Sequence, residues 1–349
     1  MPSPRELADR VERHISGGST AKQLRASVLA DLRRAFPFEG HVFMLTDPVT
    51  RVATSPMAQV PGLAWPGLPD FIRNWYLTTV NRWDGLLGGR AHSLLEATRG
   101  APERSLLWRE CQRGLRVTDT ATVAFGDRYG CWGFLELLRT SWPPFTSAEL
   151  ATLTALSRPV AMGLRQAVAR TFGASDGQVP PSGPAVVILD ADLRVRTQTT
   201  AAAALLRLNP PDQPMPPIPN SVYNVGAALI AAEHKVPIGP PRARIQVGGN
   251  RWVTVEAGRR GTDIAVSIEP CTAAERLDLF ARSHALTARE SEVLSLLAAG
   301  RDTRHMATEL GLCDHTVTDH VRAILTKCQV ANRNSLLEQA LGAARPESA

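Results

Sequence analysis

The C-terminal part of the chain, residues 286–341, carries a succession of short amphipathic segments with clear start and stop signals. Thr287 followed by Glu290 is typical of a capping box that opens a helix, and Gly300 ends that helix. A second short helix is expected before Gly311, which makes a tight turn. This spacing predicts a small module built of short helices.

The third helix of this module is expected to begin at Cys313 or Asp314 and to run to about Cys328. A fourth short helix is expected after Asn332, which can cap it. Short helices with a glycine turn before the third have the arrangement of a helix-turn-helix. The apolar positions expected to hold the second and third helices together are Ala307, Leu310, Val317, Val321, Ile324 and Leu325.

The opposite face of the third helix is polar. His315, Thr318, Asp319 and Arg322 are spaced so that they share this face, where they could meet base edges or the adjacent backbone of DNA. Arg322 is suited to donate to guanine or to phosphate, and Asp319 can accept from cytosine or position Arg322. The candidate phosphate contacts are Thr303, Arg304, Thr316, Lys327 and Arg333.

One run of residues and several single positions carry a family resemblance: Leu286-Thr-Ala-Arg-Glu-Ser-Glu-Val-Leu294, Gly300, Met306-Ala307, Leu310-Gly311, Thr316-Val317-Thr-Asp-His320, Ile324, Lys327 and Arg333. This pattern resembles the LuxR-type (GerE) DNA-binding domain. The resemblance implies a four-helix module whose third helix reads DNA and whose fourth often supports dimerisation. It also implies that Thr316 and Lys327 lie near phosphates, and that Val317 and His320 help to pack or orient the third helix.

The module departs from the family pattern in ways that affect binding. Cys313 stands where the family usually has serine, which predicts a weaker helix cap unless Asp314 takes that role. His315 and Thr318 stand where basic residues are common. From residue 280 to 349, eight basic residues are balanced by eight acidic ones, although the whole chain has a net charge of +6. We therefore expect modest non-specific affinity for DNA and a dependence on dimerisation.

Residues 1–172 are predicted to form a mixed α/β domain, with a hairpin turn at Gly126-Asp127. The expected elements are helices over 5–15 and 21–35, strands over 40–45, 120–125 and 131–138, and a long helix from the capping box of Thr146 and Glu149 to about residue 169. This order of elements, together with Trp132-Gly133 and Phe145-Thr146, resembles a GAF-type sensor domain.

A smaller α+β domain is predicted over residues 185–270. Its expected elements are strands over 185–190 and 193–195, a helix over 200–208, and strands over 242–247, 251–256 and 263–268. The order is similar to that of a PAS domain. Residues 173–184 are expected to be a linker, 209–219 a long loop and 271–283 a connecting segment before the helix-turn-helix domain, 284–349. The sensor-like order ahead of this module resembles large single-chain regulators of actinobacteria.

Tryptophan is concentrated in the N-terminal domain, which holds six of the seven residues of this type. Ordinary core packing is one interpretation, and an aromatic-lined pocket for a small molecule is the other. The candidate pocket residues are Trp75, Trp83, Trp108 and Trp132.

Several other classes of protein do not fit the sequence. Cys313, His315, His320 and Cys328 lack the paired spacing of a zinc site, so no metal is expected. Glu290 and Asp319 are expected to be a helix cap and a solvated carboxylate, and no nucleotide-binding loop is present, so neither an enzyme nor a cofactor is predicted. The lysines do not fit a phosphoacceptor receiver domain, and the tryptophan spacing does not fit an acyl-homoserine-lactone domain.

The cysteines and the length of the apolar runs indicate where the protein acts. The five cysteines are scattered, which indicates reduced thiols, and no apolar run reaches the roughly 18 residues that a membrane helix needs. The sequence thus predicts a cytoplasmic transcriptional regulator that binds double-stranded DNA as a homodimer, with a small-molecule signal in its N-terminal region and RNA polymerase as a further candidate partner. The alternative is an interaction protein whose N-terminal region binds another protein, with weak or partner-dependent DNA binding.

Overall fold

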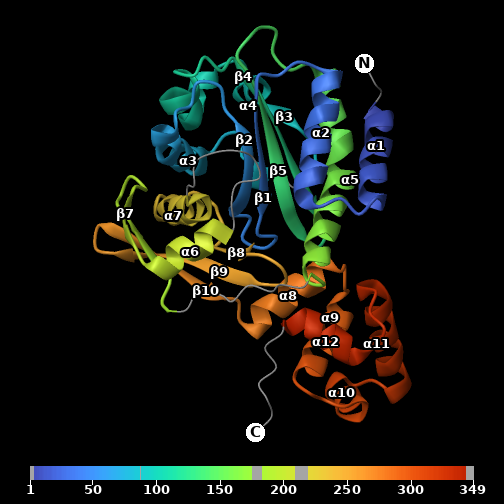
Figure 1. Ribbon diagram of the computed structural model, residues 1–349. Helices are drawn as coiled ribbons and strands as arrows, with labels where there is room; N and C mark the ends of the chain where they lie inside the picture. Colours follow the sequence, from blue (N-terminus) through green and yellow to red (C-terminus); the bar gives the residue numbers. More distant parts are fainter. Residues whose placement is uncertain (1–3, 87, 175–182, 209–218, 343–349) are drawn as a thin grey trace. The chain divides into compact units, whose positions relative to one another are not determined.

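The computed structural model describes residues 4–86, 88–174, 183–208 and 219–342 (Figure 1). By their contacts the residues form two compact units. The first unit comprises Met1–Leu164, Val179–Val247 and Val253–Glu269, and the second comprises Arg165–Gln178, Gly248–Trp252 and Pro270–Ala349. Within the described ranges no helix is long and apolar enough to cross a membrane.

The first unit contains two antiparallel sheets of five strands each. The first sheet has the order β2-β1-β5-β4-β3, and its β5 is buried along almost its whole length. Its strands are β1 (Gly40–Thr46), β2 (Ala53–Gln59), β3 (His92–Ser93), β4 (Asp119–Asp127) and β5 (Gly130–Arg139). A central strand buried on both faces requires helices on both sides of the sheet.

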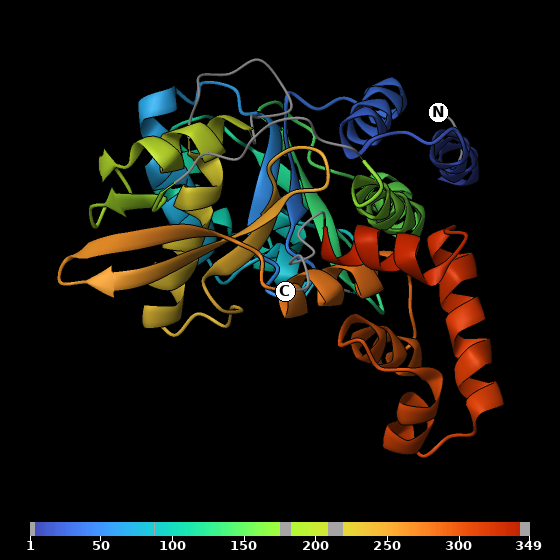
Figure 2. The same ribbon diagram turned by 60° about the horizontal axis from the view of Figure 1, so that its bottom comes forward.

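Helices supply that cover (Figure 1). One face is covered by α2 (Ala21–Ala35) and α5 (Ser147–Thr171), with α1 (Pro4–Ser16) on their outer side (Figure 2), and the other face by α3 (Leu68–Leu77). The shorter elements are η1 (Trp65–Gly67), η2 (Trp83–Gly85), α4 (Leu94–Thr98), η3 (Pro102–Arg104) and η4 (Trp108–Gln112).

The second sheet repeats the succession of the first, because its order is β7-β6-β10-β9-β8. In both sheets the second strand therefore stands at one edge, followed by the first, fifth, fourth and third. The elements are β6 (Val186–Leu189), β7 (Val195–Gln198), α6 (Thr200–Leu208), α7 (Asn220–Glu233), β8 (Arg242–Gln246), β9 (Trp252–Arg260) and β10 (Asp263–Pro270).

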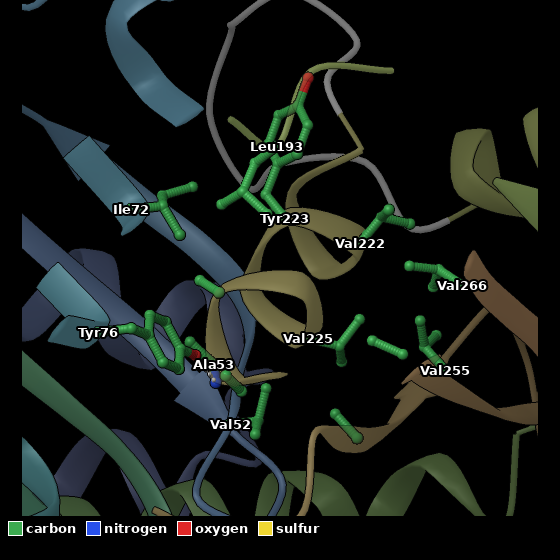
Figure 3. Close-up of a cluster of buried hydrophobic side chains, with 14 of the residues drawn as sticks. Val52, Ala53, Ile72, Tyr76, Leu193, Val222, Tyr223, Val225, Val255 and Val266 are labelled. Carbon is green, nitrogen blue, oxygen red and sulfur yellow. Dashed lines mark hydrogen bonds between the residues drawn. The ribbon is translucent and has the colours of Figure 1, made fainter. Parts of the chain in front are cut away.

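Helix α7 lies between the two sheets and joins their cores. It is buried almost all round, so it packs against neighbouring elements on every side. Figure 3 shows Val222 and Val225 of α7 directed toward Val255 and Val266 of the second sheet, while Tyr76 lies on the side of the first sheet. A Cβ added at Gly226 would come within 3.0 Å of the side chains of Leu193 and Leu189, so α7 packs closely against these two residues.

The second unit is helical. It contains α8 (Ala273–Ser283), α9 (Ala288–Ala298), α10 (Thr303–Leu310), α11 (Asp314–Cys328) and α12 (Arg333–Leu341), which Figure 2 shows in orange and red. The predicted connecting segment over 271–283 is thus mostly a capped helix, with Thr272 and Glu275 as its capping box. The end of α5, from Arg165 onward, and the loop between β8 and β9 belong to the same unit.

The predicted multidomain architecture, with sheets and helices followed by a helical C-terminal module, is confirmed, and several expected details are wrong. The β4–β5 hairpin turns at Arg128-Tyr129, two residues later than predicted, because Asp127 still pairs with Gly130. Leu193 lies in a turn with a φ of +63° instead of starting a strand. The elements β2, α3 and α7 were not expected. The predicted linker and the loop over 209–219 lie largely outside the described residues.

Candidate functional site

The helices α9, α10 and α11 form a helix-turn-helix around a small apolar core. Gly311 caps α10 with a φ of +64°, the left-handed conformation that suits glycine, and Leu312 then donates its backbone N–H to the carbonyl of Ala307. Of the predicted packing residues, Ala307, Val317, Val321 and Ile324 are buried, as are Met306 and Cys328. Leu310, His320 and Leu325 are half-buried.

The face of α11 opposite this core carries the four residues predicted to face bases. The side chains of His315 and Arg322 are 80% and 71% exposed. Between them, the carboxylate of Asp319 lies 3.3 Å from Nε2 of His315 and 3.3 Å from Nη1 of Arg322. Exposed ion pairs of this kind are weak, so both side chains can exchange Asp319 for another partner.

The fourth residue of this face is more restricted. Thr318 is half-buried, and its hydroxyl donates to the backbone carbonyl of Asp314 at 2.9 Å. A threonine that bonds the preceding turn of its own helix has its donor already satisfied. What Thr318 still offers on the exposed face is its methyl group and the lone pairs of its hydroxyl.

The predicted phosphate contacts lie in different surroundings. Arg304 on α10 is exposed, and Thr316 lies in the first turn of α11. Nη2 of Arg333, at the start of α12, donates to the hydroxyl of Thr303, at the start of α10, at 3.1 Å. The structure therefore brings Thr303 and Arg333 together, while Arg304 presents its charge to solvent.

Lys327 differs from the other phosphate candidates because its ammonium is bound inside the module. It donates to both carboxylate oxygens of Glu290, at 2.8 and 2.6 Å, and the Glu290 side chain is only 7% exposed. Burial alone would raise the pKa of this carboxyl, but the hydrogen bonds from Lys327 and Thr287 hold it below its usual value. Glu290 is therefore both the predicted cap of α9 and an anchor for Lys327, which the spacing of the sequence did not indicate.

The start of α11 is weakly capped, as the cysteine in place of serine predicts. Cys313 occupies the N-cap position, but its side chain accepts no hydrogen bond from the backbone of the first turn. Its sulfur lies 3.0 Å from the hydroxyl of Thr316, three residues later.

A serine at position 313 should stabilise the second unit relative to an alanine at the same position. We expect Cys313→Ser to be more stable than Cys313→Ala by about 1 kcal/mol, because a serine oxygen can accept the N–H of Thr316 and alanine cannot. Urea unfolding of both variants in the full chain, followed by the hydrogen exchange of α11 amides, measures this difference. Equal stability of the two variants would show that this helix start needs no side-chain cap.

In the first unit, one of the four candidate pocket tryptophans lines a cavity of about 410 Å³. Trp75 of α3 forms part of its wall, and Trp83 stacks behind Trp75 with their ring centroids 4.4 Å apart. Trp65, which was not predicted, also lines the cavity. The lining residues are Val42, Met44, Pro56, Ala58, Gln59, Val60, Leu63, Trp65, Leu68, Phe71, Ile72, Trp75, Asn220 and Asn224.

The other two tryptophans lie elsewhere and serve the fold. Nε1 of Trp108 donates to the carbonyl of Val117 at 2.9 Å. Nε1 of Trp132 donates to Asp127 at 3.0 Å, close to the turn of the β4–β5 hairpin. Neither contributes to the wall of the cavity.

Behind the cavity wall lies a buried carboxyl group, Glu136 of β5. It accepts hydrogen bonds from Nε1 of Trp75 at 3.3 Å and from Nε2 of Gln112 at 3.1 Å. Burial raises the pKa of Glu136 to about 7, although these two donors act in the opposite direction. Because its N–H is used here, Trp75 presents only the apolar part of its ring to the cavity.

No group of three metal-ligating side chains occurs in the described parts of the chain. Cys313, His315, His320 and Cys328 all lie on α11 or at its start, where Cys328 is buried and His315 is exposed.

Comparison with known proteins finds similarities to the C-terminal module. Residues 284–340 match the family of bacterial regulatory proteins described as the luxR family. The transcriptional regulatory protein DesR of Bacillus subtilis (strain 168) is 43% identical over 56 residues, which is 16% of this chain and 28% of DesR. Both matches are to regulatory proteins, in agreement with the expectation of a non-enzymatic chain.

Comparison of the whole structure finds weaker similarities. A crystal structure of Escherichia coli SdiA has 13% sequence identity and a TM-score of 0.37, covering 96% of each chain. SdiA in complex with octanoyl-rac-glycerol has 12% identity and a TM-score of 0.30, covering 98% of this chain and 90% of that one. Scores this low do not establish a common fold.

Proposed function

We propose that this chain, whose residues 284–340 form a luxR-type helix-turn-helix domain, is a sequence-specific DNA-binding transcriptional regulator. The observation that carries the proposal is the exposed polar face of α11, formed by His315, Asp319 and Arg322 on the third helix of that domain. Because α11 is held by its apolar face, the polar face is available to enter a major groove.

The donor and acceptor groups of this face suit base recognition. Arg322 can give two parallel hydrogen bonds to guanine, and His315 can donate or accept. Asp319 orients Arg322 in the free protein and can accept from cytosine once Arg322 has turned to the DNA. Arg304, Thr316 and Arg333 are assigned to phosphates, and Lys327 reaches a phosphate only by sharing or leaving Glu290.

The assignment of the remaining chain is part of the proposal. Residues 1–172 are a GAF-like sensor domain and 185–270 a PAS-like domain, joined by 173–184 and followed by the segment 271–283 and the domain 284–349. The repeated strand order of the two sheets supports the interpretation of residues 1–172 and 185–270 as two related domains. The order of a sensor region before this module is similar to that of large single-chain regulators of actinobacteria, and the protein would act in the cytoplasm.

Regulation would work through a shift of population. A small molecule that binds the N-terminal region favours one arrangement of a homodimer and so changes the affinity for DNA. The dimer is needed because residues 280–349 have equal numbers of basic and acidic residues, so one copy neutralises few phosphates. Two copies would read a two-fold symmetric site, and bound dimers could then contact RNA polymerase.

The proposal is tested by selecting genomic DNA fragments on the purified full-length protein and repeating the selection with Arg322→Ala. We expect enrichment of one two-fold symmetric motif, and a loss of about 1–3 kcal/mol at one base pair of each half-site in the variant, with relaxed preference there.

The matched control is Arg304→Ala, which removes one exposed arginine from the neighbouring helix. It should weaken binding to all sequences alike and lower the salt dependence by about one counterion. Lys327 is unsuitable as this control, because its removal also leaves the buried Glu290 carboxylate without its partner. If the wild-type protein enriches no motif, the interaction-protein alternative replaces this proposal.

A further inference from the structure

The cavity between α3 and α7 in the first unit has the properties of a small-molecule site. We propose that it binds a compact, uncharged and mostly apolar molecule that donates a hydrogen bond to Asn224. The assignment deepens the proposed function, since this molecule would be the signal sensed by the N-terminal region.

The size and lining of the cavity determine the class of ligand. Its volume of about 410 Å³ lies within the range of roughly 300–1,000 Å³ that is usual for small-molecule sites. No acidic, basic or histidine side chain is among the described residues that line it. A charged ligand would lose its hydration without gaining a counter-charge, so the lining selects a neutral molecule.

Most of the wall is apolar and held in place by its neighbours. Phe71, Ile72 and Trp75 of α3 are buried, and Trp75 is fixed by its stacking on Trp83 and by its hydrogen bond to Glu136. Trp65 both lines the cavity and is 41% exposed, so the cavity reaches the surface beside it. A rigid apolar wall with one open side accepts a ligand without a large rearrangement.

Asn224 of α7 supplies the polar contact. It is fully buried and lines the cavity, and its Nδ2 donates to the backbone carbonyl of Asn220 at 2.8 Å and to the side-chain oxygen of Asn220 at 2.7 Å. Its own Oδ1 receives no hydrogen bond from any described residue. Buried amide oxygens are nearly always paired, and a ligand O–H or N–H would supply the missing donor.

Matched aromatic probes test the assignment with the full-length protein in the absence of DNA. 1-Naphthol carries a hydroxyl donor, 1-methoxynaphthalene has the same ring without a donor, and 1-naphthoate carries a charge. Titration calorimetry or ligand-observed NMR should show saturable binding of one 1-naphthol per chain. Binding of each of the other two should be weaker by about tenfold or more.

Two variants and one control locate the binding. Ala58→Trp fills the cavity from β2 and should abolish binding of 1-naphthol. Asn224→Ala should keep binding but remove the preference for 1-naphthol over its methyl ether. Trp142→Ala should change nothing, and it is the right control because Trp142 is 74% exposed and is the surface group most able to adsorb an aromatic probe.

The site assignment is overturned if 1-naphthol does not bind, if it binds no better than its ether, or if Ala58→Trp binds it as well as the wild type. These readings use the wild-type protein and a variant at the half-buried Ala58, so they hold even if Asn224→Ala fails to fold. The two proposals can fail separately. If the wild-type protein enriches no DNA motif but binds 1-naphthol at this cavity, only the regulator proposal fails. If it enriches a motif but does not bind 1-naphthol, only the site assignment fails.

Discussion

Replacing Asp47 with alanine should destabilise the first unit by about 3–5 kcal/mol, because it removes one partner of a buried ion pair. Asp47 is 2% exposed and follows β1, while its partner Arg244 lies on β8 of the second sheet and is also buried. Nε of Arg244 donates to Oδ2 at 2.7 Å, and Nη2 donates to Oδ1 at 3.1 Å.

Further hydrogen bonds converge on the same carboxylate. It accepts the backbone N–H groups of Arg244, Val49 and Thr50, at 3.0, 2.9 and 3.1 Å. Burial alone would raise the pKa of Asp47, but the hydrogen bonds and charge of Arg244 outweigh it and hold the pKa below its usual value. In Asp47→Ala the buried guanidinium loses its carboxylate and the turn after β1 loses its acceptor.

An exposed pair of the same geometry provides the control. Arg259 donates to both oxygens of Glu233, at 2.7 and 2.6 Å, but both side chains are about one third exposed. Glu233→Ala should therefore change the free energy of unfolding by less than about 1 kcal/mol. Urea unfolding followed by circular dichroism compares the two variants, and equal effects would refute a special role for the buried pair. A double variant, Asp47→Ala with Arg244→Met, should recover part of the loss.

The contrast between local and long-range signals explains what the sequence could predict. The helices α9 to α12 were predicted nearly to the residue, because each has an apolar stripe and a capping or turn residue next to at least one of its ends. The exposed face of α11 could be predicted as well, because it lies opposite the apolar stripe of that helix. The pair of Asp47 and Arg244 joins residues 197 positions apart and leaves no local pattern.

The elements that were missed lack such a period. Helix α7 is buried nearly all round, so its apolar residues show no one-sided stripe from which to recognise a helix. Strand β2 contains Pro56, which argues against a strand in the middle of a sheet but is tolerated here because β2 is an edge strand. The cavity could not be predicted either, because its walls come from β1, β2, the segment between β2 and α3, α3 and α7, which are separated in the sequence. Asn224 can be recognised as a wall residue only once α7 is in place.

The aromatic core of the second unit leads to the other large expected effect. Phe172, just after α5, is buried in this core, although it precedes α9 by more than 100 residues in the chain. Its ring stacks on Trp252, with centroids 5.6 Å apart, and meets the edge of Phe280 at 5.2 Å. The guanidinium of Arg276 lies 5.0 Å from the same ring. A helix that begins in the first unit thus ends in the core that supports α8 and α9.

We expect Phe172→Ala to destabilise the second unit by about 3–5 kcal/mol, as other truncations of buried phenylalanine do. Hydrogen exchange of the full chain should show faster exchange of α8 and α9 amides, with β4 and β5 unchanged. Phe145→Ala is the matched control, since Phe145 is buried in the first unit. Its loss should speed the exchange of β4 and β5 amides and leave the α8 and α9 amides unchanged.

Unchanged protection of α8 in Phe172→Ala would mean that the helix-turn-helix is stable without the end of α5. If α8 does lose protection, a fragment that begins at residue 270 should show the same loss, because it lacks both Phe172 and Trp252. The stability of α8 to α12 would then depend on Phe172 and Trp252, which precede these helices in the chain.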